Sequence, residues 1–442
     1  MDLLRPEVRP YAWGSRTAIA DLQGRPVPAP GPEAELWMGA HPSAPSGLHR
    51  PPVPPVPSAP TAAIASRVTL DAVIAADPER ELGPECAARF GGRLPFLLKV
   101  LSAEQALSIQ VHPSRAQAQA GFAAENAIGL PLGNPGRNYV DDWPKPELLY
   151  ALTPFEVVAG LRTPADAAGL LHALAVDELK PLAAGLTDRG ADLGAALASV
   201  LEWPEPGPLV DAVVAACRRL AASVGPYAGA CAAAVREAAH HPGDLGVVAL
   251  LLMRHVVLQP GQAVFMPAGG LHAYLRGTGI ELLANSDNVV RAGLTPKHID
   301  VPELLKLVDP SVAVPVLAPR VLPDGISWFD TPAPEFRLYV LDLAGPALAL
   351  PAPGPRILLC LDGACTLRSV PAAPAPASDG RASGAPASGA TASGVPASGG
   401  TASGSTLDLT RGDSCFIPFS DGPVHVTGHA RLVLATPGPP PA

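Results

Sequence analysis

The stretch GQAVFMPAGGLHAY, which runs from Gly261 to Tyr274, holds a glycine, a proline, two adjacent glycines and a histidine at close spacing. Glycine and proline mark turns, so the stretch predicts a short strand over Ala263–Met266 that ends in a tight turn. The turn brings His272 to the start of the following strand. This pattern predicts a single imidazole held at a fixed place inside a small β-barrel.

Composition limits the classes of protein that the chain can form. It has 442 residues with 55 prolines and 43 glycines, which predicts about three domains and many turns. The formal net charge of −9 and the absence of a lysine and arginine block disfavour a binder of nucleic acid or of anionic membranes. No apolar signal core or membrane-length segment stands out, and the six cysteines form no CxxC pair. We therefore expect a cytoplasmic protein with reduced cysteines and no membrane partner.

The texture of the sequence changes three times along the chain. Short β-like runs with proline-rich loops give way to a helical period, then β character returns, and a further set of short strands ends the chain. A helical block between two β regions predicts an insertion into a barrel. We expect a mainly β protein with a two-part first barrel, an inserted helical domain and a second, carboxy-terminal jelly roll, with the boundaries 1–162, 163–252, 253–318 and 319–442.

The helical block is predicted from capping and periodicity. The string TPADAAGLLHAL opens with Thr163 as a cap and a proline at the first helical position. Apolar residues then recur at helical spacing, which predicts helices with one buried face. The two stripes are Leu193, Ala196, Leu197, Val200 and Leu201, and then Val210, Val213, Val214, Cys217 and Val224.

Two segments predict irregular loops. RPPVPPVPSAP, from Arg50 to Pro60, is typical of a polyproline-like surface loop. Within about 371–406 the triplet ASG recurs with a five-residue period. Alanine, serine, glycine, threonine and proline offer little apolar surface to bury, so this segment predicts a flexible loop and not a repeat fold.

A repeated sequence motif indicates that the two predicted barrels are related. GDSCFIP, from Gly412 to Pro418, repeats the spacing of glycine, five residues and proline that begins at Gly261. No histidine follows at the distance where His272 stands in the first copy. We therefore expect the functional site in the first barrel.

Two further stretches supply side chains that suit a metal. In LSIQVHPS, Gln110 and His112 stand two positions apart and share one face of a strand. In DDWPKPELLYALTPF, two prolines bracket Lys145 and stiffen the approach to Glu147. Together with His272 these residues offer two imidazoles, a carboxylate and an amide oxygen. Such a set suits Zn²⁺, with Mn²⁺, Fe²⁺ and Co²⁺ as alternatives, and leaves room for water or substrate.

Cationic side chains occur in the segments that supply the proposed ligands. Arg291 and Lys297 lie in GIELLANSDNVVRAGLTPKHIDVPEL, and Lys99 and Lys145 lie in or beside the ligand strands. Each alone is typical of a solvated surface charge. Together they predict a pocket for a phosphate or polyol substrate.

Longer blocks of the chain resemble the type I mannose-6-phosphate isomerase (phosphomannose isomerase) family of the cupin superfamily. The blocks are YAWGS, AELWMGAHPSAPS, LPFLLKVLSAEQALSIQVHPS, KPELLYALTPF and PAGGLHAYLRGTGIELLANSDNVVRAGLTPKHIDVPEL, and Gly261 to His272 matches the second cupin motif. The resemblance covers residues 10 to about 305, whereas the rest of the chain shares only its β texture. It implies a metal-bearing cupin barrel with a helical insertion and a second jelly roll.

The resemblance also implies a set of site residues. One Zn²⁺ per chain is implied on Gln110, His112, Glu147 and His272. Catalytic roles are implied for Arg291, Lys145 and Glu281, and substrate contacts for Ser108, Tyr274, Lys297 and Lys99. This chain has Pro144 where the family commonly has a histidine, which shifts the role of proton carrier to other side chains. The general base remains open between Lys145 and Glu281.

The implied activity is the interconversion of mannose 6-phosphate and fructose 6-phosphate through a cis-enediolate, with a small sugar phosphate as the only partner and a monomer or weak homo-oligomer as the assembly. Two other classes compete with it. A cupin dioxygenase would favour Fe²⁺ and histidine-rich ligation, which the glutamine ligand and the nearby cations disfavour. A sugar-binding or regulatory cupin without activity would tolerate loss of the ligands, yet all four are present.

Overall fold

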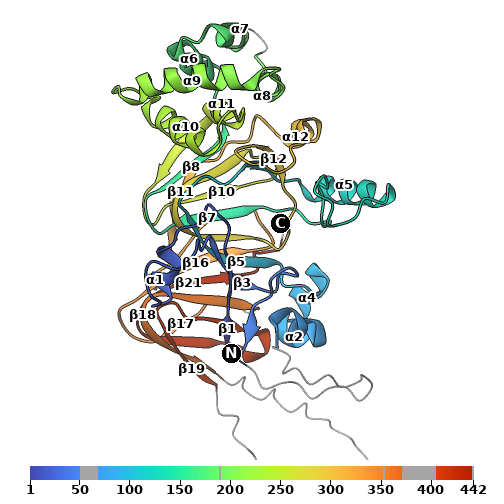
Figure 1. Cartoon of the computed structure of the whole chain (residues 1–442). Helices are drawn as coiled ribbons and strands as arrows, with labels where there is room; N and C mark the ends of the chain where they lie inside the picture. The colour runs from blue at the N-terminus through green and yellow to red at the C-terminus, as the bar shows by residue number, and fades with distance from the viewer. Residues whose placement is uncertain (50–67, 189–190, 352–353, 371–404, 441–442) are drawn as a thin grey trace, which may run out of the picture.

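The computed structural model describes residues 1–49, 68–188, 191–351, 354–370 and 405–440. Two β-sheets lie one above the other and a group of helices stands at one end (Figure 1). The proline-rich segment from Arg50 to Pro60 lies outside the described residues, as does most of the predicted Ala/Ser/Gly loop. Strand β19 begins at Thr406.

The first sheet holds eleven strands in the order β13-β10-β7-β11-β5-β3-β2, with β6, β8, β9 and β12 paired off this path. Its strands are β2 (Glu7–Arg9), β3 (Glu35–Gly39), β5 (Phe96–Ala103), β6 (Ile109–Val111), β7 (Glu147–Ala151), β8 (Phe155–Leu161), β9 (Met253–Leu258), β10 (Ala263–Met266), β11 (His272–Ala284), β12 (Val290–Gly293) and β13 (Val316–Leu317). The predicted strand over Ala263–Met266 and the strand start at His272 are confirmed.

Strand β11 belongs to both halves of this sheet. Its first residues pair with β6 and β8, and its later residues pair with β5 and β7. The change of partner strands falls at Gly277, whose φ is 136° and where a Cβ would approach the Phe155 ring to 2.8 Å. Only glycine meets both demands. The pairing of the described strands remains an open path and does not form a closed barrel.

The second sheet holds ten strands in the order β14-β15-β16-β21-β18-β20-β1-β4, with β17 and β19 paired to it. Its strands are β1 (Asp2–Arg5), β4 (Gly47–Leu48), β14 (Arg320–Val321), β15 (Ser327–Trp328), β16 (Arg337–Leu343), β17 (Leu348–Ala349), β18 (Arg356–Ser369), β19 (Thr406–Thr410), β20 (Ser414–Ile417) and β21 (Val424–Thr436). The amino-terminal strand β1 therefore pairs with β20, far away in sequence, and not with the first sheet.

The helical insertion lies between β8 and β9 and forms the top of the molecule in Figure 1. Its helices are α6 (Pro164–Leu174), α7 (Lys180–Gly185), α8 (Leu193–Leu201), α9 (Pro206–Ala221), α10 (Ala228–His240) and α11 (Gly246–Ala249). Thr163 caps α6, with its Oγ1 accepting the N–H of Asp166 at 3.2 Å, as predicted. Val224 was wrongly assigned to the buried stripe, because α9 ends at Ala221 and the Val224 side chain is exposed.

Six other helices of the described residues lie outside the insertion. They are α1 (Ala18–Leu22), α2 (Leu70–Ala76), α3 (Pro78–Leu82), α4 (Pro84–Phe90), α5 (Arg115–Ala127) and α12 (Val301–Leu307). Short 3₁₀ turns lie at Asp177–Leu179, Leu250–Leu252 and Phe419–Asp421. Among the helices of the described residues, none has the length and apolar character needed to cross a bilayer. The mainly β fold with a helical insertion and a second β unit is confirmed.

Alternation along the central strands separates a core face from a site face. On β3, β5, β7 and β11 one face carries apolar side chains, including Leu36, Met38, Leu98, Leu148 and Leu282. They share one buried cluster with Ile357 in β18 and Phe416 in β20 of the second sheet. Each such buried side chain stabilises the fold by roughly 1.5–3 kcal/mol. The opposite face of the same strands carries Glu35, Lys99, Glu147 and Glu281. The period of two thus places charged groups away from the contact between the sheets.

Candidate active site and metal centre

Strand ends bring the predicted ligands together. His112 follows the end of β6, Glu147 opens β7 and His272 opens β11. His272 lies directly opposite Gln110 in the pairing of β11 with β6. The turn before His272 depends on Gly269, whose φ is 79° and whose N–H donates to the His112 carbonyl at 3.0 Å. The tight turn thus joins the two histidine-bearing segments.

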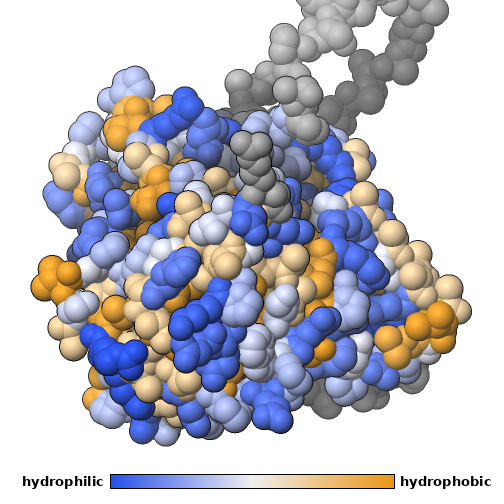
Figure 2. Space-filling view, turned by 90° about the horizontal axis from the view of Figure 1, so that it is seen from above, coloured by the Kyte–Doolittle hydropathy of each residue, from blue (hydrophilic) through white to orange (hydrophobic). Residues whose placement is uncertain are grey.

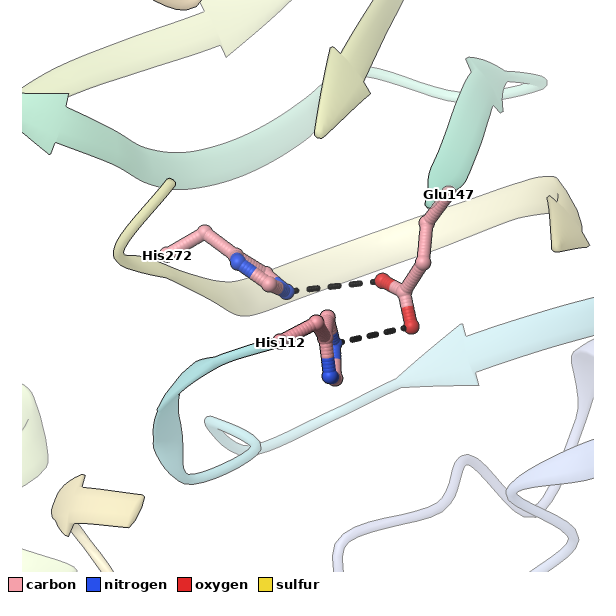
Figure 3. Close-up of side chains that lie close together, drawn as sticks. All are labelled: His112, Glu147 and His272. Atoms are coloured by element: carbon pink, nitrogen blue, oxygen red, sulfur yellow. Dashed lines mark ion pairs between the residues drawn. The ribbon is translucent and has the colours of Figure 1, made fainter. Parts of the chain in front are cut away.

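His112, Glu147 and His272 converge on one point (Figure 3). The distance from His112 Nε2 to Glu147 Oε1 is 3.2 Å, and that from His272 Nε2 to Glu147 Oε2 is 3.4 Å. One ligand atom from each residue lies within 4.8 Å of the others, and all three side chains are fully buried. It is the one such group of three histidine, cysteine or acidic side chains among the described residues.

The outer nitrogens of both rings are committed to backbone carbonyls. His112 Nδ1 lies 2.7 Å from the Asn288 carbonyl oxygen, and His272 Nδ1 lies 2.9 Å from the Gly270 carbonyl oxygen. A carbonyl only accepts, so each Nδ1 carries a proton and donates it. In a neutral ring, each Nε2 then presents a lone pair to the centre, which is the tautomer that a metal-bound histidine needs.

One of these inward atoms has no hydrogen-bond partner. His112 Nε2 is buried and unsatisfied, and it lies 3.2 Å from Glu147 Oε1, which is also in an ion pair with Lys145. A lone pair facing a carboxylate oxygen in a dry interior is costly unless a cation lies between them. The donor set therefore fits a divalent metal with nitrogen and oxygen ligands.

Gln110 lies at the edge of this group. Its amide Nε2 stands 3.4 Å from His272 Nε2. The nitrogen and oxygen of an amide are assigned from the surrounding hydrogen bonds, and rotation of the amide by 180° directs Oε1 toward the same point. The half-buried Gln110 can therefore provide the fourth oxygen.

Charge and burial set the protonation of the centre. Burial, followed by the nearby charge of Lys145, lowers the pKa of His112 to about 4, so the ring is neutral at pH 7. Burial alone disfavours the ionised form of Glu147, but the positive charge of Lys145 and the contact with His112 hold its pKa well below the usual range. The centre is thus a neutral imidazole beside an ionised carboxylate.

Lys145 and Tyr274 hold the Glu147 carboxylate from two sides. Lys145 Nζ lies 2.7 Å from Oε1, and the Tyr274 hydroxyl donates to Oε2 at 3.1 Å. Both side chains are buried. Tyr274, expected as a substrate contact, therefore lies against a metal ligand.

A second charged cluster lies on the same face of the central strands. Lys99 is directly opposite Glu281 in β11 and Trp37 in β3. Its Nζ lies 2.9 Å from Glu281 Oε2 and 3.4 Å from Glu35 Oε1. Burial raises the pKa of Glu281 to about 7, against the opposing charge of Lys99. A carboxyl group of this kind exchanges a proton near neutral pH.

The remaining predicted residues lie on the neighbouring strands. Arg291 is directly opposite Gln110 in β12, so Arg291, Gln110 and His272 share one face. Lys297 is exposed, but partial desolvation and then the nearby charge of Arg291 lower its pKa. Within the described part of the chain neither side chain has an ion-pair partner, and Ser108, half-buried before β6, makes no side-chain hydrogen bond.

Several residues of this region were not predicted from the sequence. Glu35 and Trp37 complete the Lys99 cluster, with Trp37 Nε1 donating to Glu35 Oε2 at 2.8 Å. His41 lies 3.3 Å from Asp287 beside them. The signal for Glu35 was present, because a carboxylate in the otherwise apolar run ELWMG must be paired if it is buried. No sequence signal marked Asn288.

The second β unit lacks an equivalent centre in its described residues. Strands β20 and β21 repeat the arrangement of β10 and β11, but His425 near the start of β21 is exposed. The expected restriction of the imidazole to the first unit agrees with this arrangement. The fold and the donor set define a class of proteins with two β-sheets and one candidate metal site at the ends of strands in the first sheet.

Comparison with known proteins identifies the family within this class. Residues 1–164 match the model of the phosphomannose isomerase type I catalytic domain. The chain is 34% identical to the mannose-6-phosphate isomerase of Escherichia coli K12 over 98% of each sequence, and 33% identical to that of Rattus norvegicus over 76% of this chain and 81% of the relative. A zinc-bound crystal structure of mannose 6-phosphate isomerase superposes with a TM-score of 0.80 at 33% identity, covering 99% of both chains. The chain belongs to the type I phosphomannose isomerase family.

Proposed function

We propose that this protein is a zinc-dependent isomerase that interconverts D-mannose 6-phosphate and D-fructose 6-phosphate. The observation that carries the proposal is the convergence of the Nε2 atoms of His112 and His272 on the buried Glu147 carboxylate, in a chain similar to mannose-6-phosphate isomerases along nearly its whole length. Family membership disfavours a dioxygenase. The complete ligand set, together with the buried Glu281 carboxyl group, whose pKa is raised by burial, disfavours a sugar-binding or regulatory protein without activity.

We propose one Zn²⁺ per chain, held by His112, Glu147, His272 and the Gln110 amide oxygen. When bound, zinc supplies a Lewis acid that stabilises negative charge on nearby oxygens. Lys145 and Tyr274 hold the Glu147 carboxylate in place. We therefore assign both residues to positioning of the ligand.

We assign the proton transfer to Glu281. The reaction removes the proton from C2 of the open-chain aldose to give a cis-enediolate, and returns a proton to C1 to give the ketose. The hydroxyl proton on O2 leaves while O1 gains one, so the sugar keeps its formula. A buried carboxyl group with a pKa near 7 suits this exchange. Lys145, the other candidate, lies in a close ion pair with Glu147.

Arg291 and Lys297 are assigned to the anionic part of the substrate. They are neighbouring cations without ion-pair partners among the described residues. A phosphate or a developing enediolate oxygen would supply the missing negative charge. Ser108 directly precedes β6, the strand that pairs with β12 and Arg291, and is assigned as a substrate hydrogen-bond partner. Lys99 is assigned as the cation that orients Glu281.

A general base alone does not account for the rate acceleration expected of an enzyme. A rate acceleration of about 10⁶ requires roughly 8 kcal/mol. A positioned general base contributes about 10²–10⁴, or roughly 3–5 kcal/mol. The rest must come from charge stabilisation, which assigns substantial roles to Arg291 and to the metal centre.

A coupled assay with mannose 6-phosphate, run with zinc and after chelation, tests the proposal. We expect activity in the zinc-loaded protein, loss on chelation and recovery on adding zinc. In His272→Ala, bound zinc and activity should be lost together while the helical circular dichroism signal remains. Full activity without metal would refute the proposal.

We also propose the domain units, the location and the assembly of the protein. We propose the units 1–162 with 253–318, 163–252, and 319–442, with β1 contributed to the last unit. A cytoplasmic location is supported by six buried free cysteines, which are typical of a reducing compartment. A monomer or weak homo-oligomer is supported by the surface, where hydrophobic residues form small separate groups on the face seen in Figure 2. Fractionation and light scattering test these two points.

A further inference from the structure

Asn288 connects His112 to the segment that precedes Glu147. It lies between β11 and β12 and is fully buried. Its own carbonyl oxygen accepts the proton of His112 Nδ1 at 2.7 Å. Its side chain contacts the loop at residues 140–143, which leads through Pro144, Lys145 and Pro146 to Glu147. Asn288 therefore contacts both His112 and the segment that leads to Glu147.

The hydrogen-bonding capacity of the Asn288 amide is fully used. Its Oδ1 accepts from the N–H of Val140 at 2.8 Å and from that of Asp141 at 3.3 Å. Its Nδ2 donates to the carbonyls of Asp141 at 2.8 Å and Trp143 at 2.9 Å, with a further contact to Asp141 Oδ1 at 3.1 Å. Asparagine alone presents two donors and an acceptor at this length.

Asp141, in the loop at residues 140–143, accepts hydrogen bonds from the segment that holds Asn288. Its carboxylate accepts from the N–H of Asp287 at 3.0 Å and from Ser286 Oγ at 2.8 Å, and it also accepts from the N–H of Trp143 at 2.9 Å. The loop at 140–143 and the segment at 286–288 are therefore fixed to each other by reciprocal bonds in a buried region. Such networks are rigid when every member is satisfied.

The chain from this network to Glu147 is short and stiff. Pro144 and Pro146 fix two of the intervening φ angles. The carbonyl of Pro146 accepts from the N–H of Ala284 at 3.1 Å, which attaches the end of the segment to β11. A displacement at Trp143 would be transmitted to the Glu147 carboxylate.

We propose that Asn288 is a positioning residue that sets the distance between His112 and Glu147 and fixes the His112 tautomer for metal binding. The inference rests on the proposed function only in assigning zinc to this centre. Residues that orient metal ligands typically change metal affinity by 10–100-fold when they are replaced. The side chain acts on the approach to Glu147, and the backbone carbonyl acts on His112.

The test measures zinc affinity by competition with a chelator, without substrate. We expect Asn288→Ala to raise the zinc dissociation constant by about 10–100-fold. Asn288→Asp is nearly isosteric and keeps the acceptor but loses the Nδ2 donors, so it should raise the constant as well. It provides the result if the alanine variant does not fold. Co²⁺ substitution reports the ligand geometry through its visible spectrum.

Two control variants separate positioning from general destabilisation. Asn285→Ala removes an amide of the same segment that donates to the Leu94 carbonyl, away from His112. Leu197→Ala removes a buried side chain in α8 and lowers stability without touching the site. Both should keep the wild-type zinc affinity and cobalt spectrum.

The outcomes are distinguishable from failure of the proposed function. If the wild-type protein binds no zinc, the proposed function fails. If the wild-type protein binds zinc and both Asn288 variants bind it within twofold of the wild type, the positioning role is overturned. An equal loss of affinity in Leu197→Ala would likewise overturn it.

Discussion

Arg291 shares a strand face with Gln110 and His272 but belongs to no ion pair of the described residues. A half-buried guanidinium group without an anion nearby is costly, and burial lowers its pKa. The cost is offset when an anionic substrate or transition state binds. At the scale of single residues, the unpaired cation is therefore as informative as the ligands.

Arg291→Ala should lower kcat by about 10²–10³-fold, because a cation that faces developing negative charge is removed. Zinc content should stay at the wild-type level, since Arg291 is not proposed as a ligand. Steady-state kinetics and metal analysis measure the two quantities. Arg276→Ala is the matched control, because Arg276 is exposed and pairs with Glu104 outside the site. An unchanged turnover in Arg291→Ala would remove the residue from the chemistry.

The raised pKa of Glu281 predicts the acid limb of the pH profile of kcat/KM. Burial raises the pKa of its carboxyl group to about 7, so the base is increasingly protonated below that pH and kcat/KM should fall. Bound zinc favours the ionised form, which places the limb at or below pH 7 in the loaded enzyme. Glu281→Gln should lower kcat by about 10²–10⁴-fold with zinc retained. A glutamine variant within tenfold of the wild type would exclude Glu281 as the base.

At the scale of secondary-structure elements, a charged cluster attaches α10 to the strands below it. Arg236 Nη2 lies 2.7 Å from Glu156 Oε2 in β8, and His255 Nε2 in β9 lies 2.6 Å from Glu156 Oε1. Glu237 is fully buried next to Arg236 and accepts from the N–H of Ala106 at 3.4 Å. Helix α10 is thereby joined to β8, β9 and the approach to β6.

Glu156→Gln should reduce the free energy of unfolding by about 1.5–3 kcal/mol at pH 7, because two charge-assisted hydrogen bonds are weakened. Burial alone raises the pKa of Glu156, but the hydrogen bond of His255 and the charge of Arg236 lower it below the usual 4.5. The stabilisation is therefore present above pH 4.5 and is lost as the pH falls through the lowered value.

Urea unfolding of both proteins at several pH values measures this difference. Glu104→Gln is the matched control, because Glu104 pairs with Arg276 at an exposed position and should contribute no more than about 1 kcal/mol. A difference between Glu156→Gln and the wild type that persists unchanged at pH 3 would contradict the electrostatic origin.

At the scale of the whole molecule, the metal centre joins segments that are far apart in the chain. The ligands come from β6, β7 and β11, and the helical insertion separates the first two strands from the third. A ligand that binds only the native arrangement stabilises it. Zinc is therefore expected to contribute to the stability of the first β unit as well as to activity.

Zinc at a thousand times its dissociation constant should add about 4 kcal/mol to the stability of the native state. Calorimetry of the protein with zinc and with a chelator measures the effect as a shift of the transition temperature. His272→Ala should show the same transition under both conditions. Equal transitions for the wild-type protein with and without zinc would show that no metal binds the folded centre.

The sequence by itself determined the local structure and the chemical identity of the centre. Gly261 to Tyr274 predicted β10, the turn and the position of His272, because turns and alternation are local properties of the backbone. Thr163 and the stripe over 193–201 predicted helices for the same reason. The stripe failed at Val224, where the spacing continued but the helix had already ended.

Only the tertiary structure decided how these parts meet. Pairings between distant segments join β1 to the second sheet, change the partners of β11 at Gly277 and leave the first sheet as an open path. The same holds for the Lys99 cluster and for Asn288, whose partners lie at least 145 residues away for the contacts with Asp141 to Trp143 and 176 for His112. Hydrogen bonds and ion pairs act over a few ångströms in space, and separation along the chain carries no record of that distance.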